Sequence, residues 1–395
     1  MKTFGLLLLI QLGVSHVFAQ QWSQMNDFPS NKRDDAASFT IGNIAYVGTG
    51  MDEGFIMHSD FYAYDMGTES WSQIQSLPDS ARREYASAFS YNGYGYVFGG
   101  VNQSGDYLSD LWRYDPSLDT WEYIGETVLG GRSGAMVIME NDSVYFVGGK
   151  NNISFASEEV ISYDISSGQW LTRASLPATL FRGISFEWAG YGYVGSGLSD
   201  SQALDPDFYR YKFSDDTWEL VPSMQLQIPS SYTAFSQIDS SVYVCGGMDQ
   251  SSMFNDAFQR INIPSQTSEL LSVFPSSTRR GASGFSNSLD FYITTGLQTG
   301  GIRLKETWKA EHAVSLSEEE SGAHYSHYIA DDVIYFVSEK PISNVTFFGN
   351  DGRVSVELYN LDEYSLDISE YPNGVYYYLV SFGKTFGFQK LMIAR

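Results

Sequence analysis

Residues 83–100 read REYASAFSYNGYGYVFGG. It holds two short runs of aromatic and small residues, Tyr85 to Phe89 and Tyr94 to Gly100, separated by a turn. The second run ends on a pair of glycines. Short runs of this composition between turn residues are typical of β-strands. The stretch therefore predicts two neighbouring strands of a sheet.

The same signals recur along the chain with a period of about 50 residues. Tryptophans follow each other at steps of 49, 50, 49 and 48 residues: Trp22, Trp71, Trp121, Trp170 and Trp218. The glycine-terminated strand occurs six times: Ile44 to Gly50, Tyr94 to Gly100, Val144 to Gly149, Tyr191 to Gly197, Val242 to Gly247 and Phe291 to Gly296. Each unit holds four short strands and cannot bury both faces alone, so six copies predict a six-bladed β-propeller.

The repeated residues have physical roles in such a fold. Glycine readily takes positive φ where the chain turns beside a neighbouring blade. Tryptophan on the outermost strand joins an apolar body to an N–H that can stay hydrated. The pattern resembles the kelch repeat over residues 20 to 310, which implies a kelch-type propeller. Departures from it are Gly48-Thr49-Gly50, Gly195-Ser196-Gly197, Thr295-Gly296 and Leu270 in place of a tryptophan.

The sixth unit ends early. Glu306-Thr307-Trp308 aligns with Asp110-Leu111-Trp112 on the third strand, so this unit lacks an outer strand of its own. The segment around Trp22 is expected to supply it. Closing the ring in this way removes an exposed sheet edge and joins the two ends of the propeller.

The N-terminus is predicted to carry an export signal. Lys2, an apolar run from Phe4 to Leu12 and the triplet Val17-Phe18-Ala19 predict a signal peptide of residues 1–19, cleaved after Ala19. No later stretch is apolar for long enough to cross a bilayer, so a secreted or cell-surface protein without a transmembrane segment is expected. Cys245 is the only cysteine, so packing must supply the stability that a disulfide cannot.

The tail is predicted to be a separate domain. The period is lost after Trp308, and residues 312–322, with a polar and acidic stretch, are expected to link a propeller of residues 20–311 to a domain of residues 323–395. Strand-like runs there predict a small β-sandwich: Val333 to Val337, Val345 to Phe348, Val354 to Leu358 and Val375 to Val380.

Short motifs in this tail resemble the C-terminal sorting domain of the type IX secretion system. They are Asp351-Gly352-Arg353, Leu366 to Ser369, Pro372 to Tyr376 and Lys390 to Ile393. The resemblance implies an exported protein of a Bacteroidota-like bacterium, released or attached at the outer surface, with the secretion machinery as one partner. The family's usual opening is replaced by Tyr328-Ile329-Ala330-Asp331, and an ordinary accessory sandwich is the alternative.

Charge and composition limit the classes of partner that are expected. The chain has 23 Lys and Arg against 47 Asp and Glu, a net charge of −24 that repels phosphate backbones. Nucleic acid is not expected as a partner. Aromatic residues make up 16% of the chain, a usage that favours strands over helices.

Arginine recurs near the start of the innermost strand in five of the six units: Arg33, Arg83, Arg132, Arg182 and Arg280. In kelch propellers this position opens onto the face where ligands bind, so these side chains are expected to converge at an axial pocket together with Glu84. A guanidinium group can bind carboxylate, phosphate or sulfate bidentately. The alternative is that the arginines satisfy carbonyls or nearby acids such as Asp34, Asp35 and Glu84.

The sequence gives little support to chemistry that depends on a metal or on cysteine. Copper chemistry of the galactose oxidase kind needs His and Tyr ligands and a Cys, but the chain after residue 19 has only His58, His312, His324 and His327. Cys245 lies in a strand and is expected to be a buried apolar residue. His324 and His327 lack further ligand types to complete a metal site. No metal or other cofactor is therefore expected.

The sequence is compatible with two alternative functions. The first is a surface binding module for a glycan, peptide or protein partner, with anionic ligands included. The second is a carbohydrate-active enzyme resembling the kelch-type sialic acid mutarotases, in which Glu187 or Glu84 would act as general acid and base beside the arginines. The sequence favours binding over catalysis.

Overall fold

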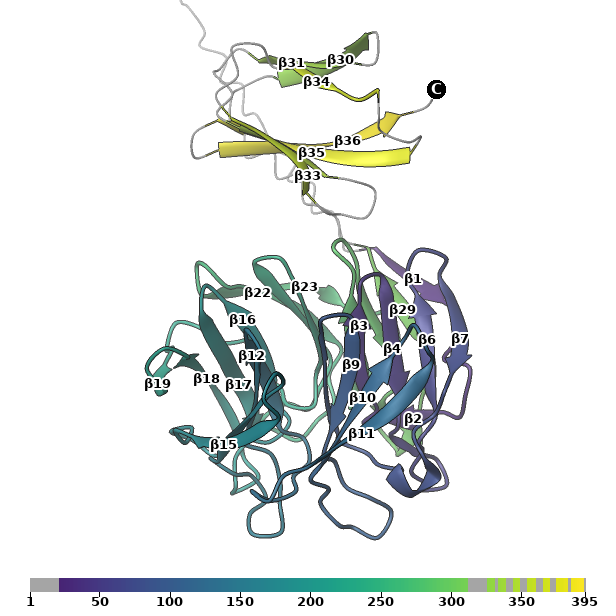
Figure 1. Cartoon of the computed structure of the whole chain (residues 1–395), viewed down its shortest axis with the longest axis vertical. Coiled ribbons are helices and arrows are strands. Elements are labelled where there is room, and N and C mark those ends of the chain that lie inside the picture. The colour runs from purple at the N-terminus through teal and green to yellow at the C-terminus, as the bar shows by residue number, and fades with distance from the viewer. Residues whose placement is uncertain are drawn as a thin grey trace, which may run out of the picture.

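The computed structural model describes residues 21–311 and seven shorter stretches of the tail: 325–330, 333–338, 344–348, 354–359, 365–369, 374–382 and 385–393. Residues 21–311 form six four-stranded antiparallel sheets around a common axis (Figure 1). Strands and turns make up nearly all of this part, with one short 3₁₀ helix, η1 (Asp79–Ala81). The prediction of an all-β, six-bladed propeller is confirmed.

Each of the first five blades uses four strands in chain order, from the axis outward. Their bounds are β3 (Ala37–Ile41), β4 (Ile44–Gly48), β6 (Phe61–Asp65) and β7 (Ser70–Ile74); β8 (Ser87–Tyr91), β9 (Tyr94–Phe98), β10 (Asp110–Asp115) and β11 (Thr120–Glu126); β12 (Met136–Glu140), β13 (Ser143–Val147), β14 (Val160–Asp164) and β15 (Gln169–Arg173); β16 (Ile184–Trp188), β17 (Tyr191–Leu198), β18 (Leu204–Lys212) and β19 (Thr217–Leu220); β20 (Ala234–Ile238), β21 (Ser241–Cys245), β22 (Ala257–Asn262) and β23 (Thr267–Val273).

The sixth blade is completed by the N-terminus, as predicted. It consists of β25 (Ser283–Ser286), β26 (Phe291–Thr294), β29 (Thr307–Ala310) and β1 (Trp22–Met25). Strand β1 pairs antiparallel with β29, and Trp22 lies opposite Ala310. The first and last strands of the propeller therefore share one sheet, and β29 has no open edge.

A ring of backbone hydrogen bonds closes the axis. One residue just before each innermost strand donates its N–H to the carbonyl of the equivalent residue in the preceding blade: Asp35 to Gly281, Tyr85 to Asp35, Gly134 to Tyr85, Arg182 to Gly134, Tyr232 to Arg182 and Gly281 to Tyr232, at 2.7–3.1 Å. All six residues have φ between 54° and 61°. The left-handed conformation turns each N–H and C=O along the ring, so the six blades are held together at this level.

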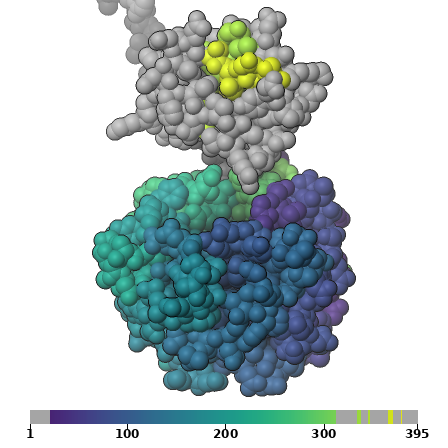
Figure 2. All heavy atoms as spheres, in the orientation of Figure 1, coloured from purple at the N-terminus to yellow at the C-terminus, as the bar shows by residue number. Residues whose placement is uncertain are grey.

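The core is divided among the six interfaces between blades. Each interface contains its own buried apolar cluster, such as Phe39, Val97 and Tyr114 between the first two blades. In four blades a phenylalanine of the innermost strand stacks on a tyrosine of the second strand: Phe39 on Tyr46, Phe89 on Tyr96, Phe186 on Tyr193 and Phe285 on Tyr292. Neighbouring blades form a continuous surface on the side shown in Figure 2.

The recurrent tryptophans join neighbouring blades. Trp71 donates its Nε1–H to Asn26 O at 3.0 Å, Trp121 to Gln75 O at 2.8 Å and Trp218 to Ala174 O at 2.9 Å. The expectation that this N–H stays hydrated is wrong for these three residues, because the carbonyl of the preceding blade is within reach. The repeat spacing of tryptophan thus reflects a contact between blades.

The glycine doublet has the predicted role. A Cβ on Gly99 would lie 2.5 Å from Arg132 O of the next blade, and one on Gly100 would lie 2.7 Å from Glu84 O. Thr49, Ser196 and Thr295 take φ of 51–63° where other units have glycine. The left-handed turn is therefore kept even where the sequence departs from the doublet.

The described stretches of the tail form two antiparallel sheets, in agreement with the predicted sandwich-like domain. One contains β30 (Tyr325–Ala330), β31 (Val333–Ser338) and β34 (Ser365–Asp367); the other contains β33 (Val354–Tyr359), β32 (Asn344–Phe348), β35 (Gly374–Phe382) and β36 (Thr385–Ile393). The predicted signal peptide and linker, residues 1–19 and 312–322, lie outside the described residues. Within the described residues no helix has the length and hydrophobicity needed to cross a membrane.

Candidate functional site

The propeller has two different ends. The loop face is formed by the six loops between second and third strands, residues 49–60, 99–109, 148–159, 199–203, 246–256 and 295–306. The hairpin face carries the short turns that join first to second and third to fourth strands. The axial ring lies at the loop-face end of the innermost strands, near the label β2 (Arg33–Asp34) in Figure 1.

Four arginines occupy one repeated position beside this ring: Arg33, Arg83, Arg132 and Arg279. Each is buried and donates to the carbonyl 16 residues later. Each also binds the acid 27 residues later. The pairs are Arg33–Asp60 at 2.5 Å, Arg83–Asp110 at 2.7 Å, Arg132–Glu159 at 3.3 Å and Arg279–Glu306 at 2.7 Å. Burial alone would raise the pKa of Asp60 and Asp110, but their arginines hold both below the usual value.

These pairs correct the prediction of an arginine ring. Arg33, Arg83 and Arg132 do not reach an axial pocket, because a carboxylate of their own blade binds each of them in the interior. The residue at the equivalent position of the sixth blade is Arg279, whereas the sequence pointed to its neighbour Arg280. The spacing of 27 residues between Arg279 and Glu306 is the signal that distinguishes the two.

Only two of the five predicted arginines meet at the axis. Arg182 and Arg280 approach the buried carboxylate of Asp35 from two sides, with N–O distances of 2.5 and 3.4 Å. Both guanidinium groups also lie against the ring of Tyr232, at 5.2 and 4.7 Å from its centroid. Asp35 therefore occupies the place that an anionic ligand of these two arginines would take.

Glu84 joins this axial cluster, which we define as Asp34, Asp35, Glu84, Arg182, Arg280 and Arg303. Glu84 is buried, and its Oε2 has no hydrogen-bond partner among the described residues. Burial and the nearby charges of Asp35 and Asp34 raise the pKa of Glu84 to about 8. Burial and Asp35 raise the pKa of Asp34 to about 7, although Arg303 binds it at 2.5 Å. The cluster fills the axis beneath the loop face.

The tips of the loop face expose large apolar side chains. Phe55 is 66% exposed, Ile153 92% and Met253 59%, in loops of the first, third and fifth blades. Ile56, Ile302 and Val128, which lies in the connection between the second and third blades, are also exposed. Side chains of this kind on several loops of one face form the apolar tips of the loop face.

A common turn holds these loops. In four blades the last residue of the sequence Gly-x-Asp/Asn accepts two backbone N–H bonds from the loop that follows: Asp52 from Gly54 and Ile56, Asn102 from Ser104 and Asp106, Asn151 from Ile153 and Ser154, and Asp249 from Ser251 and Met253. Side-chain bonds within such turns fix the backbone locally. The motif repeats after the glycine doublet, so it was present in the sequence and was missed.

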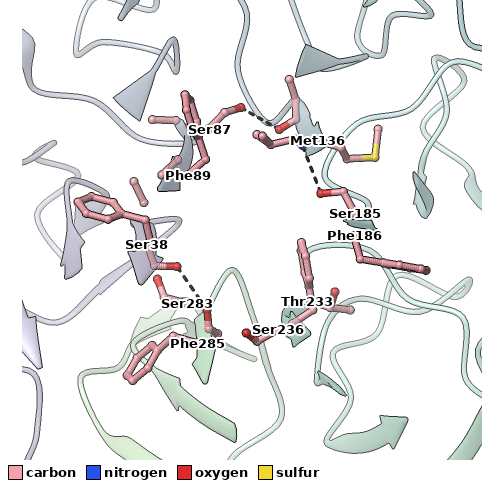
Figure 3. A pocket seen from close by; sticks show the side chains of 18 of the residues that line it. Ser38, Ser87, Phe89, Met136, Ser185, Phe186, Thr233, Ser236, Ser283 and Phe285 are labelled. Carbon is pink, nitrogen blue, oxygen red and sulfur yellow. Dashed lines mark hydrogen bonds between the residues drawn. The ribbon is translucent and has the colours of Figure 1, made fainter. Parts of the chain in front are cut away.

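A shaft runs along the axis on the other side of the cluster. It is a cavity of about 410 Å³ lined by all six innermost strands, and Figure 3 shows serine, threonine and aromatic side chains around its open centre. Glu187 lines its wall and accepts the N–H of Met139 at 2.7 Å. Burial raises the pKa of Glu187 to about 7. Glu187 is thus separated from Glu84, and the two do not share a site.

The remaining candidates do not assemble a reactive centre in the described residues. Cys245 is buried as predicted, and burial raises the pKa of its thiol well above the usual value. His58 pairs with Asp52 at 3.0 Å on the loop face. No group of three or more metal-ligating side chains occurs in the described parts of the chain. His312 and His324 lie outside the described residues.

Six four-stranded blades, glycine-ended second strands and tryptophans on the outer strands define a kelch-type β-propeller. Comparison with known proteins agrees. The family model described as the KLHDC2/KLHL20/DRC7 kelch-repeats domain matches residues 11–177. The solved structure of YjhT superposes with a TM-score of 0.57 and 14% identity, covering 72% of this chain and 96% of that one, which supports the fold.

Two curated proteins are similar over part of the chain. α-Scruin of Limulus polyphemus is 26% identical over 120 residues, 29% of this chain and 13% of that protein. A kelch domain-containing protein of Sulfurisphaera tokodaii is 26% identical over 124 residues, 31% of this chain and 17% of that protein. The chain thus matches less than a fifth of the length of either relative.

Proposed function

We propose that this protein is an exported binding module that takes a partner protein or peptide on its loop face. The observation that carries the proposal is the set of apolar tips, contributed by loops of several blades. Exposed apolar side chains that gather on one face of a protein often mark an interaction site. Aromatic residues and methionine are also enriched at the centres of protein interfaces.

The loops that carry the tips are held in place before any partner arrives. Gln103 of the second blade accepts the Met57 N–H at 2.8 Å and donates to Phe55 O at 3.0 Å. Asp200 of the fourth blade accepts the N–H groups of Phe155 and Ala156. These bonds tie loops of neighbouring blades together. A rigid surface loses less conformational entropy on binding, which favours affinity.

The chemistry of the face favours apolar contacts over capture of an anion. Arg182 and Arg280 are already bound to Asp35, so an anionic ligand would have to displace a buried carboxylate. Breaking a buried ion pair is strongly unfavourable. We therefore assign the partner's main contacts to the apolar tips, and not to the arginines.

The proposal is tested by photo-crosslinking. A photoreactive amino acid is placed at Phe55, Ile153 or Met253 and, as a matched control, at Leu118, which is 70% exposed in a turn of the hairpin face. With proteins of the native host as prey, we expect the same partner to be crosslinked from at least two loop-face positions and not from Leu118. Crosslinks confined to Leu118 would contradict the proposal.

Once that partner is purified, its affinity is measured for truncated side chains. Phe55→Ser or Met253→Ser is expected to weaken binding by about fivefold or more, because removing a central apolar contact costs more than ~1 kcal/mol. Leu118→Ser should leave Kd unchanged. Equal Kd values for all variants would show that the apolar tips are not the binding surface.

One observation favours a second candidate, acid–base catalysis on a sugar in the axial cluster. Glu84 combines an unpartnered oxygen with a pKa of about 8, close to the working range of a general acid or base. Its burial makes this the weaker candidate. Incubating the protein with one anomer of sialic acid and following anomerisation by NMR tests it. Acceleration that Glu84→Gln abolishes would support catalysis, and an unchanged rate would exclude it.

Export is the remaining part of the proposal. The sequence at residues 1–19 supports a first membrane crossing, and the motifs of residues 366–395 support sorting by the type IX system. The two sheets of the tail are compatible with such a domain. Under this proposal the loop face meets an extracellular or surface partner outside the cell.

A further inference from the structure

The axial shaft is a second site, separate from the loop face. Its lining runs from Ala36 and Ala86 beside the ring to Thr40 and Ser90 near the hairpin face. The axial cluster fills the loop-face end, with Asp35, Asp34 and Glu84 all buried. The shaft is therefore a blind pocket that opens toward the hairpin face. Its volume of about 410 Å³ lies within the range of small-molecule sites.

The wall of the shaft is polar but contains few charged side chains. Hydroxyl groups line it on several blades: Ser38, Thr40, Ser87, Ser90, Ser185, Thr233, Ser236 and Ser283. Arg182 and Glu187 are the only lining residues of a charged type in this described pocket. Arg182 is bound to Asp35, and burial raises the pKa of Glu187 to about 7. Both charged side chains of the wall therefore already have partners within the protein, through the Arg182–Asp35 ion pair and the hydrogen bond that Glu187 accepts from the Met139 N–H.

The hydroxyl groups are fixed by contacts between blades. Ser87 donates to Ala135 O at 2.8 Å, and Ser185 accepts the Val137 N–H at 3.2 Å. Ser236 and Ser286 are 2.8 Å apart. A hydroxyl has one donor and two acceptor positions, so a serine that donates to a carbonyl, as Ser87 does, can still accept a hydrogen bond. Val137 and Met139 of the third blade and Phe235 of the fifth add apolar surface to the wall.

We propose that the shaft binds a small neutral molecule rich in hydroxyl groups, of the size of a monosaccharide or cyclic polyol. The hydroxyl groups of the wall recognise its hydroxyls, and the apolar side chains among them contact its C–H groups. This inference goes beyond the proposed function, because the axial cluster separates the shaft from the loop face.

Protection of an introduced thiol tests the inference. Cys245, the only native cysteine, is buried, so Ser90→Cys places one reactive thiol in the shaft wall of the whole chain. Ser104→Cys in an exposed loop is the matched control. Maleimide labelling is followed with D-galactose, myo-inositol or D-glucuronate added until any protection saturates. The unfolding midpoint of each variant is compared with that of the parent chain.

We expect galactose or inositol to slow labelling of the Ser90→Cys variant by about fivefold, the effect of a ligand well above its Kd. The Ser104→Cys variant should be unaffected. Labelling that no neutral probe slows, or that only glucuronate slows, would overturn the proposal. If the Ser90→Cys variant unfolds, saturation-transfer NMR of the parent chain with the same probes decides the matter, and absence of transfer from the neutral probes would overturn it.

Discussion

At the scale of single residues, the four repeated arginines act as internal supports of the blades. Each guanidinium group crosses from the loop-face end of the innermost strand to a carbonyl just after the second strand and to a carboxylate at the start of the third. A buried charge of this kind is tolerated only when it is paired and hydrogen-bonded. The acid beside the third strand supplies both conditions, so the repeated arginine marks an internal ion pair and not a ligand site.

Removal of one partner should therefore destabilise the propeller. Arg83→Ala leaves Asp110 as an unpaired carboxylate in a largely buried position, and we expect the free energy of unfolding to fall by about 3 kcal/mol or more. Arg210→Ala is the control, because Arg210 forms an exposed pair with Glu219 and such pairs contribute less than ~1 kcal/mol. Urea denaturation of both variants measures the difference. Equal losses would show that Arg83 has no special structural role.

The axial carboxyls predict how stability depends on pH. In the folded state the pKa of Glu84 is about 8, above its ordinary value of 4.5. Between these pH values the unfolded chain has lost this proton and the folded chain retains it, so the group's contribution to stability falls as pH rises. The loss is at most about 1.4 kcal/mol per pH unit for one group.

Glu84→Gln removes this titration while keeping a side chain of similar shape. We expect the free energy of unfolding of the variant to decline less between pH 5 and 8 than that of the parent, by calorimetry or urea denaturation. Glu187→Gln removes a separate group with a pKa of about 7 and should flatten another part of the same curve. Parallel curves for the parent and the Glu84→Gln variant would contradict the assigned pKa.

At the scale of strands and loops, the features that recur in every blade could be predicted from the sequence. The features that differ between blades were missed. Glycine doublets and tryptophans recur because every blade makes the same turn and the same contact with its neighbour, so a single chain reveals both. Arg182 and Arg280 lie slightly beyond the repeated arginine position, and an approximate repeat period could not detect so small an offset. The apolar tips have no fixed residue type, although the preceding Gly-x-Asp/Asn motif marks their loops.

Strand β1 should be essential to the propeller because it covers the edge of β29. Removing residues 21–26 deletes this strand and leaves the backbone groups of Thr307 to Ala310 unpaired. We expect a lower melting temperature and aggregation through the exposed edge, measured by thermal unfolding and light scattering. An unchanged melting temperature and solubility would show that β1 does not close the ring.

At the scale of the whole molecule, we propose that recognition and delivery belong to different parts of the chain. The propeller carries the loop face and the shaft, and the tail carries motifs that contribute nothing to the repeat. Removing residues 366–395 is expected to leave the protein in the periplasm of a host with a type IX system, while partner binding by the loop face is retained. Cell fractionation measures the first result. Truncated protein outside the cell at the level of the full-length chain would exclude a sorting role.

Hydrogen–deuterium exchange of the whole chain with its crosslinked and purified partner tests whether the partner binds the loop face and not the hairpin face. We expect the partner to slow exchange in the loops around Phe55, Ile153 and Met253 and to leave the hairpin-face turn at Leu118 unchanged. Slower exchange confined to the hairpin face or to the tail, with the three loops unchanged, would contradict binding at the loop face.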